Sequence, residues 1–427
     1  MNKKNIGLVT LSIIAVACLL GAIILSWNNP VPSVSKSESN TTVIDEKTGE
    51  LVEIEDTTEK GEKTVSSNDV SVLENLNLLE CYSGYLKNFV EEHPEDNIVI
   101  SPEALNSWLS IYSNILDDSD KDKLKAALDK DYTGYKFGDN FKVLNKIFID
   151  TNTDIKDFDA LSDISVSVNM QDNSAIDSKK TFIYDAILEQ LGTDDGISNF
   201  LNVREYNKDT GYNIVNMTEF NGHLLDSNSQ ATTFRFDKDS DEGLHSKGAY
   251  STPIGLALVD GDYFGFKTCH VYKMPYADNY NFVVILPRKE YSISDIDIVD
   301  IVDKVKNNSD EAYKYELRED DTIPVMCFLP YFVTYFDSNI TLSDLGLGYL
   351  QNKYPTDNIE QYNAFSIWDS KSVILKPEIS MSDLRTANKD TTDLFIYVNR
   401  PFIFYVEDIE NDGIAYLGAI NKLSKKQ

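Results

Sequence analysis

The amino-acid sequence predicts an α+β fold for residues 70–427, and three observations support this class. Helical patterns, with apolar residues every three or four positions, dominate the first part of this region. Strand patterns cluster in the second part. The two kinds of pattern do not alternate strictly, as they would in a doubly wound α/β protein. Since no internal repeat of roughly 20 to 50 residues is visible, we expect a single domain.

The composition narrows the possible partners. The chain has 427 residues, with 39 basic and 70 acidic side chains and a net charge of -31. This excess of negative charge argues against nucleic acid and against a basic surface that would bind anionic lipids. The four cysteines form no Cys-x-x-Cys pair, so they indicate neither a disulfide scaffold nor a four-thiolate zinc site. We therefore expect no nucleic acid, no metal and no other cofactor.

The N-terminus predicts a membrane anchor. Residues 6–27 carry no charge and follow Lys3 and Lys4. At 1.5 Å per residue this run extends about 33 Å, enough to span a bilayer. The lysines place the N-terminus in the cytoplasm, so residues 1–27 are interpreted as a single-pass anchor and the C-terminal domain as extracellular. A cleaved signal peptide of a secreted protein, or a lipoprotein attached at Cys18, remains an alternative.

Residues 28–69 separate this anchor from the domain. They are rich in Ser, Thr, Glu, Lys and Asn and show no apolar period. Such a composition cannot bury enough apolar surface to fold, so we predict a disordered linker.

Helices come first in the domain. An apolar stripe predicts a helix from Val70 to His93, which Pro94 ends. A short buried strand, residues 97–100, leads to Ser101 as N-cap and Pro102 as the first residue of the next helix. Further expected elements are a strand in 142–150, a helix in 178–191 and a strand in 211–220.

Strands dominate the second half. Two of them, residues 268–275 and 281–287, are joined by a turn at 276–279. The remaining expectations are a helix in 293–306, strands in 325–329 and 332–336, and two apolar runs in 394–406 and 413–420 around a turn at 410–412.

Candidate catalytic and metal sites are weak. Residues Asp237–Asp241 imitate a calcium loop, but Glu242 and Gly248 stand where that loop needs glycine and a bidentate glutamate. His270 follows Cys269 in a predicted strand, where a packed residue is expected more than a nucleophile pair. The sequence has no nucleophile elbow, no phosphate-binding loop and no His-Glu-x-x-His motif, so we do not expect an enzyme.

The order of several motifs resembles the serpin family. Residues 399–406 and 413–418 resemble its closing signature, and residues 97–102 resemble its first strand with the Ser-Pro start of its second helix. Further blocks follow in the family's order: Asn145–Phe148, Val215-Asn216, Phe220–Gly222, Met274–Tyr276, Ile285–Pro287, Leu329-Pro330, and Leu342 with Leu345 and Gly346. No single block is specific for the family. The occurrence of all these blocks in the family's order, over about Val70 to Lys422, is specific.

The resemblance implies a single domain of about nine helices and three β-sheets. It also implies a reactive loop that a protease cleaves and that then inserts as an extra strand into the central sheet. Ser101, Pro102 and Asn216 match the shutter region, where this sheet opens. Because alternate side chains of the inserted strand become buried, insertion needs a glycine hinge followed by small residues.

This sequence departs from that pattern in the loop. Aligning Leu375-Lys376 with the family's His-Lys pair replaces the shutter histidine by Leu375 and places Asp383 at the start of the hinge. Counting about 16 residues onward from Asp383, as an inhibitor requires, reaches Asn399 in the closing signature, so the loop is expected to be too short to insert. The expected reactive loop comprises Asp383, Leu384, Arg385, Thr386, Ala387, Asn388, Lys389 and Asp390.

Two function hypotheses follow. By resemblance, the protein is an extracellular, membrane-tethered member of the serine protease inhibitor class whose partner is a serine or cysteine protease. Arg385 and Lys389 are its candidate bait residues, since a trypsin-like pocket accepts basic side chains, and the alternative for both is a solvated loop charge. The second hypothesis is a non-inhibitory extracellular binding module, motivated by the hinge without glycine. In both we expect a monomer.

Overall fold

The computed structural model describes the elements of two separate units, residues 1–65 and 66–427. The described residues are 42–44, 51–53, 76–128, 130, 132, 137–138, 140–153, 164–172, 175–186, 205–206, 211–222, 228–234, 252–276, 279–309, 325–330, 332–354, 356–366 and 394–423.

The first unit contains one small antiparallel sheet. It pairs β1 (Thr42–Ile44) with β2 (Leu51–Glu53), inside the segment predicted to be a disordered linker. The predicted anchor lies outside the described residues. Among the helices that the structure describes, none is long and apolar enough to cross a membrane.

The second unit contains six α-helices within the described ranges. The sequence explains where several of them begin: the Asn77 side chain accepts hydrogen bonds from the amides of Leu79 and Glu80, and Ser101 caps the helix that Pro102 starts. The helices are α2 (Leu78–Glu92), α3 (Pro102–Tyr112), α4 (Asp118–Ala127), α5 (Ala175–Ala186), α6 (Ile298–Lys306) and α7 (Gly348–Lys353), with short 3-10 turns η2 (Ser113–Ile115) and η5 (Ile293–Asp295).

Two of the three larger sheets hold most of the C-terminal strands. A six-stranded sheet has the order β3 (Ile98–Ile100), β17 (Gly413–Ile420), β16 (Phe402–Asp408), β11 (Tyr280–Pro287), β10 (Cys269–Tyr276) and β9 (Asp262–Gly265). A four-stranded sheet has the order β15 (Leu394–Tyr397), β12 (Val325–Pro330), β8 (Thr252–Asp260) and β7 (Asn228–Phe234).

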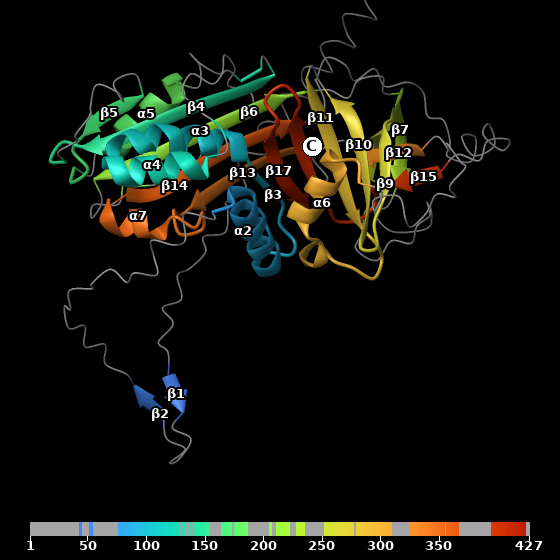
Figure 1. Cartoon of the computed structure of the whole chain (residues 1–427), viewed down its shortest axis with the longest axis horizontal. Helices are drawn as coiled ribbons and strands as arrows, with labels where there is room; N and C mark the ends of the chain where they lie inside the picture. Colours follow the sequence, from blue (N-terminus) through green and yellow to red (C-terminus); the bar gives the residue numbers. More distant parts are fainter. Residues whose placement is uncertain are drawn as a thin grey trace, which may run out of the picture. The chain divides into compact units, whose positions relative to one another are not determined.

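The third sheet contains the candidate site. Its five strands follow the order β13 (Val333–Ile340), β14 (Thr356–Ser366), β6 (Tyr212–Asn221), β4 (Phe141–Asp150) and β5 (Ser165–Val168), and they lie side by side in Figure 1. β14 and β6 are parallel neighbours, whereas β13 and β4 run antiparallel to them.

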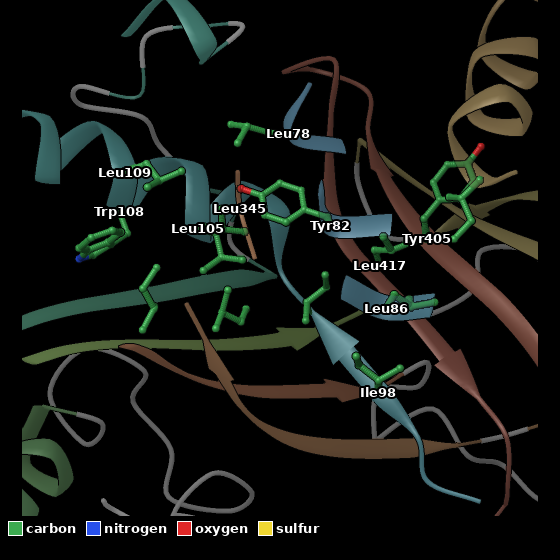
Figure 2. Packing of buried hydrophobic residues seen from close by; sticks show 14 of the residues in the cluster. Leu78, Tyr82, Leu86, Ile98, Leu105, Trp108, Leu109, Leu345, Tyr405 and Leu417 are labelled. Carbon is green, nitrogen blue, oxygen red and sulfur yellow. The ribbon is translucent and has the colours of Figure 1, made fainter. Parts of the chain in front are cut away.

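The main hydrophobic core packs helices against these sheets. Leu78, Tyr82 and Leu86 of α2 meet Leu105, Trp108 and Leu109 of α3 in one cluster with Ile98 and Leu417 (Figure 2). Trp108 and Leu86 have no exposed surface. A second cluster lies between β4, α5, β6 and β14, and it includes Phe148, Ile183, Met217 and Tyr362.

The α+β class is confirmed, and so are most of the predicted elements. One apolar run, residues 394–406, is divided into β15 and β16 because Asn399-Arg400-Pro401 interrupts it. The buried Arg400 guanidinium donates to the carbonyl oxygen of Pro287 at 2.8 and 3.0 Å, which accounts for its place between two strands. The strand β14 was not expected from the sequence.

Candidate functional site

The candidate site is the seam between β6 and β14. The two strands pair directly, from Ile214 opposite Ile359 to Asn221 opposite Ser366, and no other strand lies between them. Successive side chains of a strand point to opposite faces of a sheet. The seam therefore has two faces, and each of them buries polar groups.

On the first face, three amide side chains form a row across the sheet. The pairing places Gln361 of β14 opposite Asn216 of β6, and Asn216 opposite Asn145 of β4. Gln361 Nε2 donates to Asn216 Oδ1 at 2.7 Å, and Asn216 Nδ2 donates to Asn145 Oδ1 at 2.6 Å. Gln361 and Asn216 have no exposed surface. These bonds connect the side chains of three strands directly, independently of the backbone ladder.

The N-terminus of α3 docks on this row. The Ser101 amide donates to Gln361 Oε1 at 3.1 Å, Gln361 Nε2 donates back to the Ser101 carbonyl at 3.3 Å, and the Ser101 hydroxyl donates to the Ala415 carbonyl of β17 at 2.7 Å. Pro102, buried next to Ser101, starts the helix without an amide hydrogen that would need a partner. The structure thus brings together the predicted shutter residues Ser101, Pro102 and Asn216.

The row continues along the seam through Asn363 and Thr218. Asn363 Nδ2 donates to Gln361 Oε1 at 2.9 Å and to the Val99 carbonyl at 2.8 Å, and Thr218 donates to Asn363 Oδ1 at 2.7 Å. The hydroxyl of Tyr416 in turn donates to Thr218. Hydrogen bonds of this kind contribute about 1 kcal/mol each, whereas a buried polar group that loses its partner costs about 1 to 3 kcal/mol. Opening the seam would break several of them at once.

The second face carries a buried ion pair. Lys179 of α5 lies 2.8 Å from Glu360 of β14, and their side chains are 0% and 3% exposed. The same Glu360 oxygen accepts from Asn213 of β6 at 2.9 Å, and the other oxygen accepts from Tyr362 at 3.0 Å. Burial, followed by the negative charge of Glu360, raises the pKa of the nearby Tyr206 phenol. These contacts attach α5 directly to β14 and, through Glu360, to β6.

The contacts of Gln361 favour a second alignment, in which Gln361 and not Leu375 occupies the position of the shutter histidine. Within the part of the chain that the structure describes, Gln361 is the residue of the strand next to β6 that pairs with Asn216 and Ser101. Leu375 lies outside the described residues. β14 ends at Ser366 and β15 begins at Leu394, so 27 residues, numbered 367–393, lie between the two strands in the sequence. The expected short loop falls in this stretch and stays a prediction.

The predicted reactive-loop residues, Asp383 to Asp390 with the candidate baits Arg385 and Lys389, lie outside the described residues. The imitation calcium loop at 237–241 also lies outside them.

The pair Cys269 and His270 is structural, as expected. Burial raises the pKa of the Cys269 thiol to about 12, which disfavours the reactive thiolate. The His270 ring contacts the Tyr263 hydroxyl through Nδ1 at 3.0 Å. A nucleophile would need an accessible thiolate next to a base, and Cys269 is fully buried.

A cavity of about 340 Å³ lies elsewhere in this unit, at the ends of α2, α3 and α6 and beside the turn between β16 and β17. Three ion pairs involve its charged wall residues: Glu103 with Lys130 at 3.1 Å, Lys306 with Asp412 at 2.6 Å, and Glu407 with Lys273 at 2.6 Å. Its geometry therefore adds no catalytic group to the site.

Sequence reasoning missed Gln361, Glu360, Lys179 and Asn213. The one available signal was Ile359 and Phe365 six positions apart, which frame a polar segment and place both apolar side chains on one face of a strand. Polar residues at the intervening positions hide this pattern.

Known proteins agree with this architecture. The family model described as Serpin (serine protease inhibitor) matches residues 83–423. No curated protein sequence matches the chain. Among solved structures, the thermophilic serpin tengpin in its native state is similar with 16% identity and a TM-score of 0.57, covering 85% of this chain and 96% of tengpin.

Two further structures have the same fold. Mouse protein-Z dependent protease inhibitor shows 17% identity and a TM-score of 0.56, covering 83% of this chain and 99% of its own. Thyroxine-binding globulin in complex with thyroxine shows 14% identity and a TM-score of 0.57, covering 82% and 98%. At these low sequence identities, the similar structures support the fold alone. The match that shows the family is that of the family model, which spans most of the chain. The chain therefore belongs to the serpin family.

Proposed function

We propose that the protein presents residues 367–393 as bait to an extracellular serine protease, and that the protease cuts this segment without being trapped. The observation that supports the presentation of residues 367–393 as bait is the closed seam, in which no strand is inserted between β6 and β14. β6 and β14 pair directly, while 27 residues lead from the end of β14 to β15. A sheet without an inserted strand, next to a long connecting segment, is the arrangement that the family's mechanism requires before cleavage.

The second alignment favours Arg385 as the bait. When Gln361 instead of Leu375 is aligned with the family's shutter histidine, the start of the hinge moves from Asp383 to Asp369. The same count of about 16 residues then ends at Arg385. A guanidinium at this position suits a protease with a carboxylate in its specificity pocket. Lys389, four residues later, remains the second candidate.

The residues of the segment oppose stable trapping. The second alignment puts Lys371 where the hinge glycine belongs, and residues 367–393 contain no glycine. An inserted strand would include Lys376, Pro377 and Glu378. Proline cannot donate a hydrogen bond to a neighbouring central strand. Burial of an unpaired polar group costs about 2 kcal/mol or more. The seam would also have to give up the bonds of Gln361 and the ion pair of Glu360.

Incubation of the protein with trypsin tests this proposal. We expect cleavage after Arg385, identified by mass spectrometry of the fragments, and no complex that survives SDS. Arg385→Ala should move or slow the cut, and Lys389→Ala is the matched control in the same segment. A band of protein plus protease that resists SDS would show trapping. If residues 367–393 stay intact under these conditions, the role as bait is refuted, and the hypothesis of a non-inhibitory binding module remains.

The location of the protein is part of the proposal. The uncharged run of residues 6–27 behind two lysines supports a single-pass anchor with the serpin domain outside the cell. Contact with a protease at the cell surface is consistent with such a tether. We propose that the domain acts as a monomer.

A further inference from the structure

The second face of the seam holds three groups that can react with one another. The Lys179 amine and the Asn213 amide nitrogen both donate to one oxygen of Glu360, at 2.8 and 2.9 Å. The amine and the amide are therefore separated by no more than these two hydrogen bonds placed end to end. They come from different elements, α5 and β6, and the carboxylate comes from a third, β14.

The surroundings of this cluster exclude water. Lys179 and Asn213 have no exposed surface, and Glu360 is buried as well. The Lys179 ammonium lies 4.9 Å from the centre of the Tyr206 ring and 5.9 Å from that of Phe148. A lysine held in an apolar site becomes a nucleophile once a neighbouring base takes its proton. A primary amide is a weak electrophile, so its attack by an amine needs this positioning and a proton relay.

We propose that Lys179 and Asn213 form an intramolecular isopeptide bond, with Glu360 as the proton relay. Glu360 Oε1 takes a proton from the Lys179 ammonium, and the freed electron pair of Nζ bonds to Cγ of Asn213. The bond from Cγ to Nδ2 then breaks, and its electron pair stays on Nδ2. Glu360 hands the proton to Nδ2, and the second hydrogen that Nζ must lose leaves with ammonia as ammonium ion. Glu360 returns to a carboxylate, and no oxidant or other reactant is needed.

The positions of the two hydrogen bonds support this role of Glu360. One oxygen touches both the attacking nitrogen and the leaving nitrogen, so a proton can pass from the first to the second without movement of the strand. Tyr362 holds the other oxygen at 3.0 Å and fixes the orientation of the carboxylate. The product would attach α5 covalently to β6, on the face of the seam opposite Gln361.

Peptide mapping of the full-length chain tests the proposal. After purification and incubation at neutral pH, tryptic digestion should give one branched peptide that joins the stretch containing Lys179 to the stretch containing Asn213. Its mass should be lower than the sum of the two free peptides by one ammonia, about 17 Da. Trypsin should no longer cut after Lys179, because the modified lysine has lost its charge.

Variants separate the roles of the three groups. Lys179→Arg and Asn213→Ala should each abolish the branched peptide, and Glu360→Gln should abolish it while keeping a polar side chain in place. Lys180→Arg, at the exposed neighbouring position of α5, is the matched control and should leave the link intact. Full recovery of the unmodified Lys179 peptide from wild-type protein with a cooperative melt would overturn the proposal. Persistence of the link in Glu360→Gln would overturn the relay.

Discussion

Gln361 is the residue whose replacement tests the seam most sharply. In Gln361→Ala, the Ser101 amide loses the acceptor at 3.1 Å and Asn216 Oδ1 loses the donor at 2.7 Å. Both groups are buried, and each costs about 1 to 3 kcal/mol when left unsatisfied. Because water can enter part of the space that the side chain leaves, we expect a loss of about 2 to 4 kcal/mol in the free energy of unfolding. This is a large part of the roughly 5 to 15 kcal/mol that stabilises a domain.

Urea denaturation followed by circular dichroism measures this loss. Gln351→Ala is the matched control, since its side chain makes a long 3.4 Å contact with Ser343 at the surface, and it should change stability by less than about 0.5 kcal/mol. Gln361→His should recover much of the stability, because a neutral imidazole offers one donor and one acceptor. A Gln361→Ala variant as stable as the control would refute the assignment of Gln361 to the shutter.

Two other predictions concern the pH dependence and the location of the protein. Lys353 contacts Asp117 and Asp120 at 2.6 Å each, and this amine, followed by the Asp120 amide, lowers the pKa of Asp117 to about 2. The resulting stability is present above the ordinary pKa of about 3.9 and is lost as the pH falls through about 2. Denaturation should therefore show Lys353→Met less stable than wild type near pH 7, with a difference that shrinks as the pH falls toward 2. Lys304→Met is the control. An offset that persists unchanged at acid pH would contradict this cause. External protease on intact cells should release a soluble fragment that begins between residues 28 and 69, and protection of the whole chain would refute the tether.

Much of the fold was predictable because local chemistry and burial agree. Asn77 and Ser101 cap helices with their own side chains, and strands such as β11 are apolar along most of their length. Apolar spacing alone does not locate a helix end and predicts this helix from Val70, whereas the Asn77 cap marks the start of α2 at Leu78.

The strand β14 was missed for a physical reason. Glu360, Gln361 and Asn363 are buried, whereas the pattern of apolar and polar residues in a sequence assigns such polar side chains to the surface. Their partners, Lys179, Asn216 and Ser101, lie far away in the sequence, so nothing local shows that these polar groups are satisfied.

The measurement that tests the account most directly is a melting curve before and after a single cut at Arg385. Insertion of the cut segment between β6 and β14 would add a sixth strand to this sheet and make it far more stable. We predict a change of no more than a few degrees, because Lys376, Pro377 and Glu378 do not suit a buried central strand. Arg385→Ala, left uncut, gives the reference curve. A rise of tens of degrees in the cut protein would show that the seam opens and accepts the strand, and would contradict the proposal that the protease escapes.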